Sequence, residues 1–182
     1  MSFHYFEINL IPIEDMAMGA LLNQVVHRLH KMPGMNEKRY ALTFPNVKGQ
    51  ALGSTLRIFG RDTGAVQSLY DGLSLQYFFR DYSNVGAIKS IEMDYSGTWI
   101  AFSRFRIPSK KSDRNNSGLH ERRFREAQAM PFLHVKSTST KREFIMRVKV
   151  TRQKRMQGAF EPNSYGFGSI DNPVWLPDIV NA

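Results

Sequence analysis

The chain has 182 residues, 42% of them hydrophobic and 23% charged, a balance that supports one folded domain or two small ones and excludes disorder over the whole length. The absence of cysteine excludes a disulfide scaffold, a thiolate zinc site and a cysteine nucleophile. The opening MSFHYFEINL lacks the features of a signal peptide, and no apolar run approaches the ~20 residues of a membrane span. We therefore expect a cytoplasmic protein with no membrane partner.

The positive charge is concentrated in one segment. From Arg104 to Arg155 there are 16 basic and 4 acidic residues, a net charge of +12, whereas the whole chain carries +9 and the remainder therefore −3. Such a segment is typical of a protein with a polyanionic partner, because each Lys or Arg set against a phosphate releases condensed counterions. We favour a nucleic-acid partner over a basic face that is merely solvated. Like charges confined to one segment repel one another, and a polyanion would offset that repulsion.

The first half of the chain predicts the element order β-α-β-β-α-β. Alternating apolar residues indicate strands, and apolar residues spaced three and four apart indicate amphipathic helices. In chain order we expect a strand at 6–10, a helix at 18–29 ending near Pro33 and Gly34, a hairpin of strands 40–45 and 55–59, a helix capped by Asp62, and a strand near 87–93. This is the ferredoxin-like pattern, an antiparallel sheet with two helices on one face.

The second half predicts a further set of strands around one helix. We expect a strand at 99–106, a loop at 107–118, a helix at 119–129, and strands at 132–136 and 142–152 joined by residues 137–141. In the last strand, apolar side chains from Phe144 to Val150 alternate with a face that carries Arg147 and Lys149. The sequence therefore predicts an α+β protein, with a ferredoxin-like domain over 1–96 and a basic α+β domain with an arginine-bearing helix over 97–182.

The histidines do not predict a metal site. His27 and His30 have the spacing of two ligands on adjacent helical turns, but no further ligand accompanies them. Spacing alone does not choose between these two histidines, and by itself it favours a structural histidine at the helix end. Tyr165-Gly-Phe-Gly168 has too few glycines for a nucleotide motif and fits either a phosphate contact or an ordinary tight turn. We expect no metal and no cofactor.

Several segments, in order, carry a resemblance to a known family. They are Leu29-His30-Lys31, Leu42-Thr-Phe-Pro45, Leu56-Arg-Ile58, Ser103-Arg104-Phe105-Arg106, Pro131-Phe132, Ser137-Thr138-Ser139-Thr140, Phe144-Ile-Met-Arg147 and Ser164-Tyr165-Gly166. With them the chain resembles the type I-F CRISPR repeat endoribonucleases of the Cas-six family, which cut precursor CRISPR RNA at the base of a repeat hairpin. The Ser-x-Ser-Thr run, the aromatic strand and the late Tyr-Gly are the most specific elements.

The resemblance implies metal-independent cleavage in which a ribose 2′-OH attacks the adjacent phosphate and leaves a 2′,3′-cyclic phosphate. His30 matches the histidine that acts on the attacking or leaving oxygen, Ser137 the serine that holds the 2′-OH, and Tyr165 an aromatic residue beside the same phosphate. Orientation and a base of near-neutral pKa are what a protein can supply to this reaction without a metal, and histidine suits the second role.

The resemblance also implies a set of RNA-binding residues. Arg104 and Arg106 occupy base-reading positions, from which both can bind guanine O6 and N7. Phe144 matches an aromatic residue that stacks on the lowest base pair, although its alternation fits core packing equally well. The other expected contacts are phosphate contacts from Arg122, Arg123 and Arg125 and contacts from Ser139 and Thr140.

The expected partners are the CRISPR repeat hairpin and other subunits of a type I-F surveillance complex. Two features depart from the family pattern: Glu121 and Glu126 interrupt a short arginine helix, and the chain end from Pro173 is long. A ferredoxin-like RNA-hairpin-binding protein without catalysis, in which His30 is structural, is the main alternative. An architectural DNA-binding protein is a further one.

Overall fold

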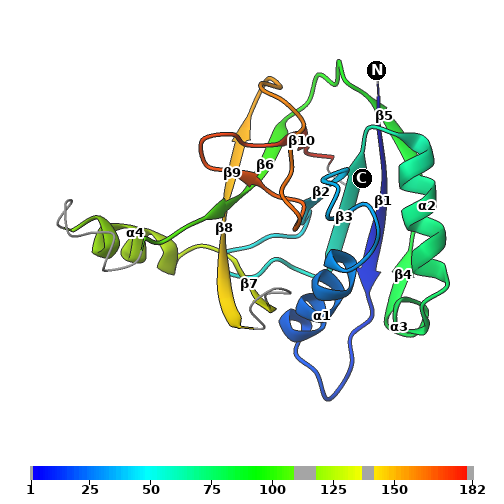
Figure 1. The fold of residues 1–182 in the computed structure, drawn as a ribbon, viewed down its shortest axis with the longest axis horizontal. Coiled ribbons are helices and arrows are strands. Elements are labelled where there is room, and N and C mark those ends of the chain that lie inside the picture. Colours follow the sequence, from blue (N-terminus) through cyan, green and yellow to red (C-terminus); the bar gives the residue numbers. More distant parts are fainter. Residues whose placement is uncertain (1, 109–117, 137–141, 180–182) are drawn as a thin grey trace.

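The computed structural model describes residues 2–108, 118–136 and 142–179. Across these ranges the chain forms two sheets that follow one another in sequence (Figure 1). The first uses strands up to Glu92 and the second uses strands from Trp99 onward. No helix in these ranges is long and apolar enough to cross a membrane.

The first sheet has the ferredoxin-like strand order. Its strands are β1 (Ser2–Leu10), β2 (Tyr40–Thr43), β3 (Thr55–Gly60), β4 (Ser83–Val85) and β5 (Lys89–Glu92). They lie in the order β2-β3-β1-β4, with β5 beside the other end of β1, and every pairing is antiparallel. The helices α1 (Met18–His30) and α2 (Thr63–Ser74) supply the two connections that the pattern requires. The βαββαβ prediction is confirmed.

Both helices form where the sequence predicts them. The apolar stripe of α1, including Leu22, Val25 and Leu29, is buried in the core. The α2 N-terminus is capped by Asp62, whose carboxylate accepts the backbone N–H of Ala65 at 3.0 Å. This bond gives a partner to one of the backbone N–H groups of the first turn, which have no acceptor within the helix.

The edge of this sheet differs from the prediction in two respects. The strand expected at 87–93 is shorter, at Lys89–Glu92, and a separate strand, β4, precedes it; β4 pairs with Ile8–Leu10 and β5 with Ser2–Tyr5. Between them the backbone N–H of Gly86 donates to the carbonyl of Glu7 at 2.8 Å. An additional helix, α3 (Tyr77–Tyr82), precedes this edge, and its six residues are too few to show a helical period.

The second sheet repeats the strand order of the first. Its elements are β6 (Trp99–Phe105), α4 (Leu119–Gln128), β7 (Phe132–Lys136), β8 (Glu143–Gln153), β9 (Gly168–Ser169) and β10 (Trp175–Pro177). They lie in the order β10-β6-β8-β7, with β9 parallel to the far end of β6. Residues 154–167 form coil where the first sheet has its second helix. The predicted α+β class is confirmed.

The helix α4 does not cover this sheet. Figure 1 shows it projecting away from the body of the protein. It is anchored at its base, where Ala127 and Met130 pack on Phe105. A helix that leaves the sheet exposes most of its surface, and its placement therefore favours a role in binding over a role in the core.

The two sheets share one hydrophobic core. Phe102 and Val148 of the second sheet belong to the same buried cluster as Leu42, Phe44 and the apolar stripe of α1. The division into domains 1–96 and 97–182 stays a prediction. The two sheets use separate parts of the sequence on either side of this boundary, but their side chains form one common core.

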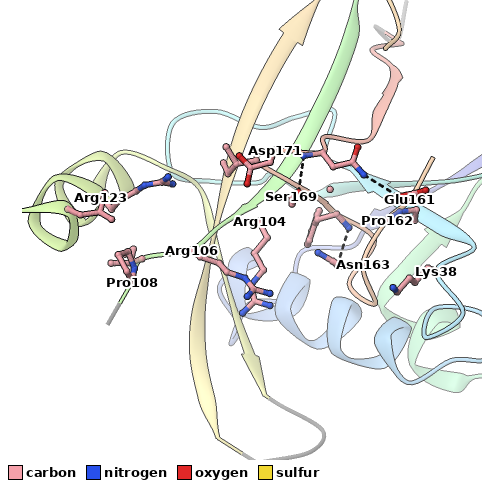
Figure 2. A pocket seen from close by; sticks show the side chains of 16 residues that line it. Lys38, Arg104, Arg106, Pro108, Arg123, Glu161, Pro162, Asn163, Ser169 and Asp171 are labelled. Atoms are coloured by element: carbon pink, nitrogen blue, oxygen red, sulfur yellow. Dashed lines mark hydrogen bonds between the residues drawn. The ribbon is translucent and has the colours of Figure 1, made fainter. Parts of the chain in front are cut away.

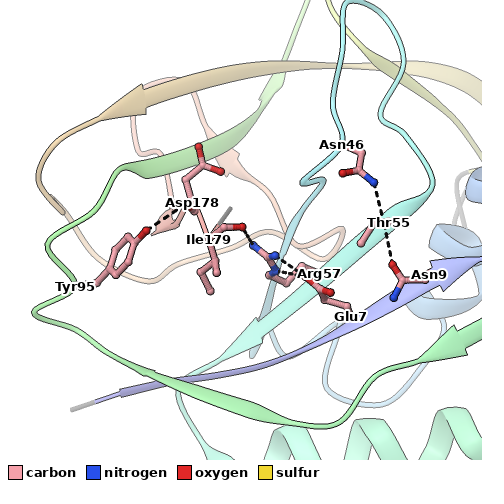
Figure 3. A network of polar contacts seen from close by, with 8 residues as sticks. All are labelled: Glu7, Asn9, Asn46, Thr55, Arg57, Tyr95, Asp178 and Ile179. Carbon is pink, nitrogen blue, oxygen red and sulfur yellow. Dashed lines mark hydrogen bonds and ion pairs between the residues drawn. The ribbon is translucent and has the colours of Figure 1, made fainter. Parts of the chain in front are cut away.

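A buried arginine of the first sheet donates a hydrogen bond to the C-terminal segment (Figure 3). Arg57, only 1% exposed, donates from Nε to the Glu7 carboxylate at 2.8 Å and from a terminal nitrogen to the Ile179 carbonyl at 3.0 Å. From the second sheet, Arg152 of β8 pairs with the Asp178 carboxylate at 2.7 Å. The Glu7 carboxylate balances the buried charge of Arg57. The contacts to Ile179 and Asp178 attach the end of the described chain to both sheets. This accounts for the long chain end noted in the sequence.

Candidate active site and RNA interface

The candidate histidine is held in one orientation at the end of α1. His30 is 5% exposed, and its ring Nδ1 lies 2.8 Å from the Ser164 carbonyl oxygen. A carbonyl only accepts, so Nδ1 carries the proton of this bond, and in the neutral ring Nε2 keeps its lone pair. A histidine in this state can accept a proton at Nε2.

Tyr165 lies flat against His30. The two ring centroids are 4.0 Å apart with planes 10° from parallel. Burial raises the pKa of the Tyr165 hydroxyl above its usual value, and the Arg104 guanidinium offsets part of this shift. The phenol is therefore neutral at physiological pH, and Tyr165 can donate a hydrogen bond there but does not act as a base.

A tight turn fixes both partners of His30. The side chain of Asn163 accepts the backbone N–H groups of Tyr165 at 2.8 Å and Phe167 at 3.3 Å. Gly166 has φ +79°, its carbonyl accepts the Leu42 N–H at 2.8 Å, and a Cβ on it would lie 2.5 Å from Leu42 Cγ. The turn is therefore attached to β2 and needs glycine there.

Sequence reasoning singled out the glycine of this turn and missed Asn163. The signal that could have found it is an Asn followed three residues later by a glycine, because Asn side chains accept backbone N–H groups two residues on. Through this turn Asn163 fixes both the Ser164 carbonyl and the Tyr165 ring.

Arg104 joins this group from β6. Its guanidinium lies 5.4 Å from the centroid of the Phe144 ring on β8. Burial, together with the nearby Arg106, lowers the pKa of Arg104 from its usual value. Arginine nevertheless remains charged at neutral pH. An anionic ligand would stabilise this half-buried cation strongly, because it would offset both the burial of the charge and the repulsion from the second cation.

Arg104 and Arg106 line a groove of about 590 Å³. Arg106 lies one residue beyond the end of β6, and Figure 2 shows its guanidinium group close to that of Arg104. The cations Lys38 and Arg123 also line the groove, and the carboxylates of Glu161 and Asp171 do so as well. This arrangement can bind a group with both acceptors and donors, such as a base edge.

The arginines of α4 do not act as one face. Arg122 and Arg125 are exposed, whereas the guanidinium of Arg123 lies 4.9 Å from the centroid of the Phe105 ring and lines the groove. Glu126, which from the sequence is expected to interrupt the basic face of the helix, pairs with Lys149 of β8 at 3.1 Å. That acidic residue therefore ties α4 to the sheet.

The structure thus brings together four of the predicted residues. His30 stacks on Tyr165, and Arg104 lies over the Phe144 ring. The charge of Arg104 acts on the Tyr165 hydroxyl, and Arg106 is near Arg104. Ser137, Ser139 and Thr140 lie outside the described residues. Within the described part of the chain, no cluster of three or more His, Asp or Glu could hold a metal ion.

Comparison with known proteins identifies the class. A family model described as CRISPR-associated protein (Cas_Csy4) matches residues 5–174, nearly the whole chain. The class predicted from the sequence, a CRISPR RNA-processing endoribonuclease, is confirmed at this level. The chain belongs to the Cas_Csy4 family.

Two solved structures also show similarity to this chain at low sequence identity. Thermus thermophilus Cse3, bound to an RNA representing a pre-cleavage complex, is 8% identical, with 97% of this chain and 100% of that chain covered and a TM-score of 0.43. The CRISPR endoribonuclease Cse3 bound to a 19-nucleotide RNA is 10% identical over the same shares, with a TM-score of 0.41.

Proposed function

We propose that this protein cuts precursor CRISPR RNA at the base of the repeat stem without a metal ion and stays bound to the product hairpin. The observation that carries the proposal is the orientation of His30, whose Nδ1 is bonded to the Ser164 carbonyl while its ring stacks on Tyr165. The family match and the +12 segment provide its context.

In the proposed reaction, Nε2 of His30 accepts the proton of the ribose 2′-OH. The 2′-oxygen then forms a bond to the adjacent phosphorus, and the bond from phosphorus to the 5′-oxygen breaks. The products are a 2′,3′-cyclic phosphate and a 5′-oxygen that takes a proton from water to become a 5′-OH. The neutral Tyr165 hydroxyl donates to a phosphate oxygen. Ser137 holds the 2′-OH, as the resemblance implies.

The remaining residues bind the hairpin. Arg104 and Arg106 read guanines of the lowest pairs, and Phe144 stacks on the end of the stem. Arg122 and Arg125, which are exposed on α4, contact stem phosphates. Along the stem the major groove of A-form RNA is too narrow for side chains to read bases, whereas Arg104 and Arg106 reach the lowest pairs from the open end of the stem. Ser139 and Thr140 add contacts on the strength of the resemblance. The partners are the repeat hairpin and, in the cytoplasm, other subunits of a type I-F complex.

A hairpin-binding protein without catalysis is the second candidate. The observation that favours it is the burial of His30, because a structural histidine would also be buried and hydrogen-bonded. Incubating the protein with a repeat hairpin in EDTA separates the two. A discrete cut at the stem base supports the nuclease, and a mobility shift with intact RNA supports the binder.

A further inference from the structure

A second groove, of about 480 Å³, lies between α1 and the end of α2. We call it the flank groove; its lining includes Gln24, His27, Arg28, Lys31, Gly72 and Gln76. The first four of these recur three and four residues apart and so share one face of α1. None of them has a role in the proposed cleavage.

The flank groove is positively charged. Arg28 is exposed on α1, and Lys31, the C-cap residue that follows the last turn of α1, is exposed as well. Lys136, at the end of β7 and outside the groove lining, is also exposed. Burial lowers the pKa of His27, and Lys31, His30, Lys136 and Arg28 lower it further, in that order. These groups therefore surround His27 with positive charge. The acidic side chains within α2 and α3 have other partners: Asp71 accepts from Gln67 at 2.8 Å, and Asp81 pairs with Arg80 at 3.1 Å.

Exposed aromatic rings continue from the groove. The Arg28 guanidinium lies 4.1 Å from the centroid of the Phe78 ring, and Arg80 lies 4.7 Å from that of Tyr77. Tyr77 is 72% exposed and Tyr82 is 39% exposed, although both are large and partly apolar. Cations that follow a backbone beside rings that can stack with bases are the features of a single-strand binding surface.

The groove starts next to the candidate active site. His27 precedes His30 by three residues on α1, and Lys31 follows it by one. At about 100° per residue, these side chains lie roughly 60° and 100° around the helix from His30. A strand that continues beyond a phosphate at His30 would therefore meet them first.

We propose that the flank groove binds the single-stranded RNA immediately 3′ of the scissile phosphate, with phosphates on Arg28 and Lys31 and a base on Tyr77. This rests on the proposed function, because it takes the scissile phosphate to lie at His30. The groove would then select precursors that still carry their downstream segment and would release that segment after cleavage.

The test uses a repeat hairpin with 2′-deoxyribose just upstream of the cut, so that a bound flank stays attached. Affinities are measured against salt for the bare hairpin, for one with a 3′ flank of about six nucleotides and for one with an equal 5′ flank. The variants are Arg28→Gln and Tyr77→Ala, which change exposed side chains. Lys89→Gln, an exposed cation on β5, is the matched control.

The 3′ flank should tighten binding about tenfold and steepen the slope of log K against log salt by about 1.4, from two cations at roughly 0.7 each. Arg28→Gln and Tyr77→Ala should each remove much of this gain, while the bare hairpin and Lys89→Gln stay within about twofold of the wild type. The proposal is overturned if the 5′ flank gives the same gain, or if both variants keep the full gain. Variants that keep the gain but lose association with another protein subunit would make this surface a protein interface instead. Failure to bind the bare hairpin would count against the proposed function itself.

Discussion

His30 and Tyr165 are positioned by the same turn. Their rings stack with centroids 4.0 Å apart, and the carbonyl that accepts the His30 Nδ1 proton belongs to Ser164, the residue before Tyr165. The proton location and the ring plane of the histidine are therefore set together, by a segment distant in sequence.

His30→Ala should lower the cleavage rate by ~10² to 10⁴, the usual contribution of a positioned acid or base. Binding of the hairpin should change little, because one neutral imidazole adds little to a charge-driven interface. Tyr165→Phe keeps the stacked ring and should be milder. Single-turnover cleavage and a binding assay on the same RNA measure both effects. His134→Ala, an exposed histidine on β7, is the control, and wild-type cleavage by His30→Ala would refute the assignment.

Asn163→Ala should slow cleavage between about tenfold and 10²-fold, because small displacements of a catalytic group are costly, while the hairpin Kd stays the same. Asn163→Asp retains an oxygen acceptor for the N–H groups of Tyr165 and Phe167, so it should restore most of the rate. The NMR signal of the His30 Nδ1 proton gives an independent readout, since it should broaden in Asn163→Ala. Equal losses in the two variants would show that the acceptor does not matter.

Arg104→Ala or Arg106→Ala should each cost about 1 to 3 kcal/mol of binding and relax the preference for guanine in the lower stem. Arg122→Ala or Arg125→Ala should weaken the binding of all hairpins about equally, because the proposed function assigns these exposed arginines of α4 to stem phosphates. Competition binding with stems of altered sequence distinguishes the two patterns. A sequence-selective loss in the α4 variants would mean that the base-reading residues are wrongly assigned.

His27 should titrate below pH 6.5 in the folded protein, because burial and neighbouring cations disfavour its charged form. The unfolded state then binds the proton more readily, so the His27 contribution to the free energy of unfolding is present above pH 6.5 and decreases as the pH falls through the lower folded pKa. His27→Gln should remove that part of the decrease between neutral and acidic pH in urea unfolding. An NMR titration that places His27 above 6.5 would contradict this account.

The sequence predicts most of the first sheet, because its elements have clear periods. The apolar stripe of α1, the cap at Asp62 and the hairpin of β2 and β3 are all local signals, and the structure confirms them. The short strands β9 and β10 could not be predicted, since two or three residues show no alternation. Their pairing depends on β6, which is far away in sequence.

For the site, the resemblance identified residue types, and the structure adds how they meet. Spacing did not choose between His27 and His30, whereas the contacts of Ser164 and Tyr165 involve His30. Asn163 escaped notice because its role is to hold backbone N–H groups in a turn. The different roles of Arg122 and Arg123 likewise depend on where α4 leaves the sheet, which no local pattern reveals.

The central claim is that the substrate supplies its own nucleophile, and a single 2′-deoxyribose tests it most directly. A repeat hairpin with this change just upstream of the cut should bind in EDTA with normal affinity and remain intact. The unmodified hairpin should be cut in the same buffer to a product ending in a 2′,3′-cyclic phosphate. Cleavage of the deoxy substrate, or a requirement for Mg²⁺, would mean that water attacks the phosphate and would contradict the roles given to His30, Ser137 and Tyr165.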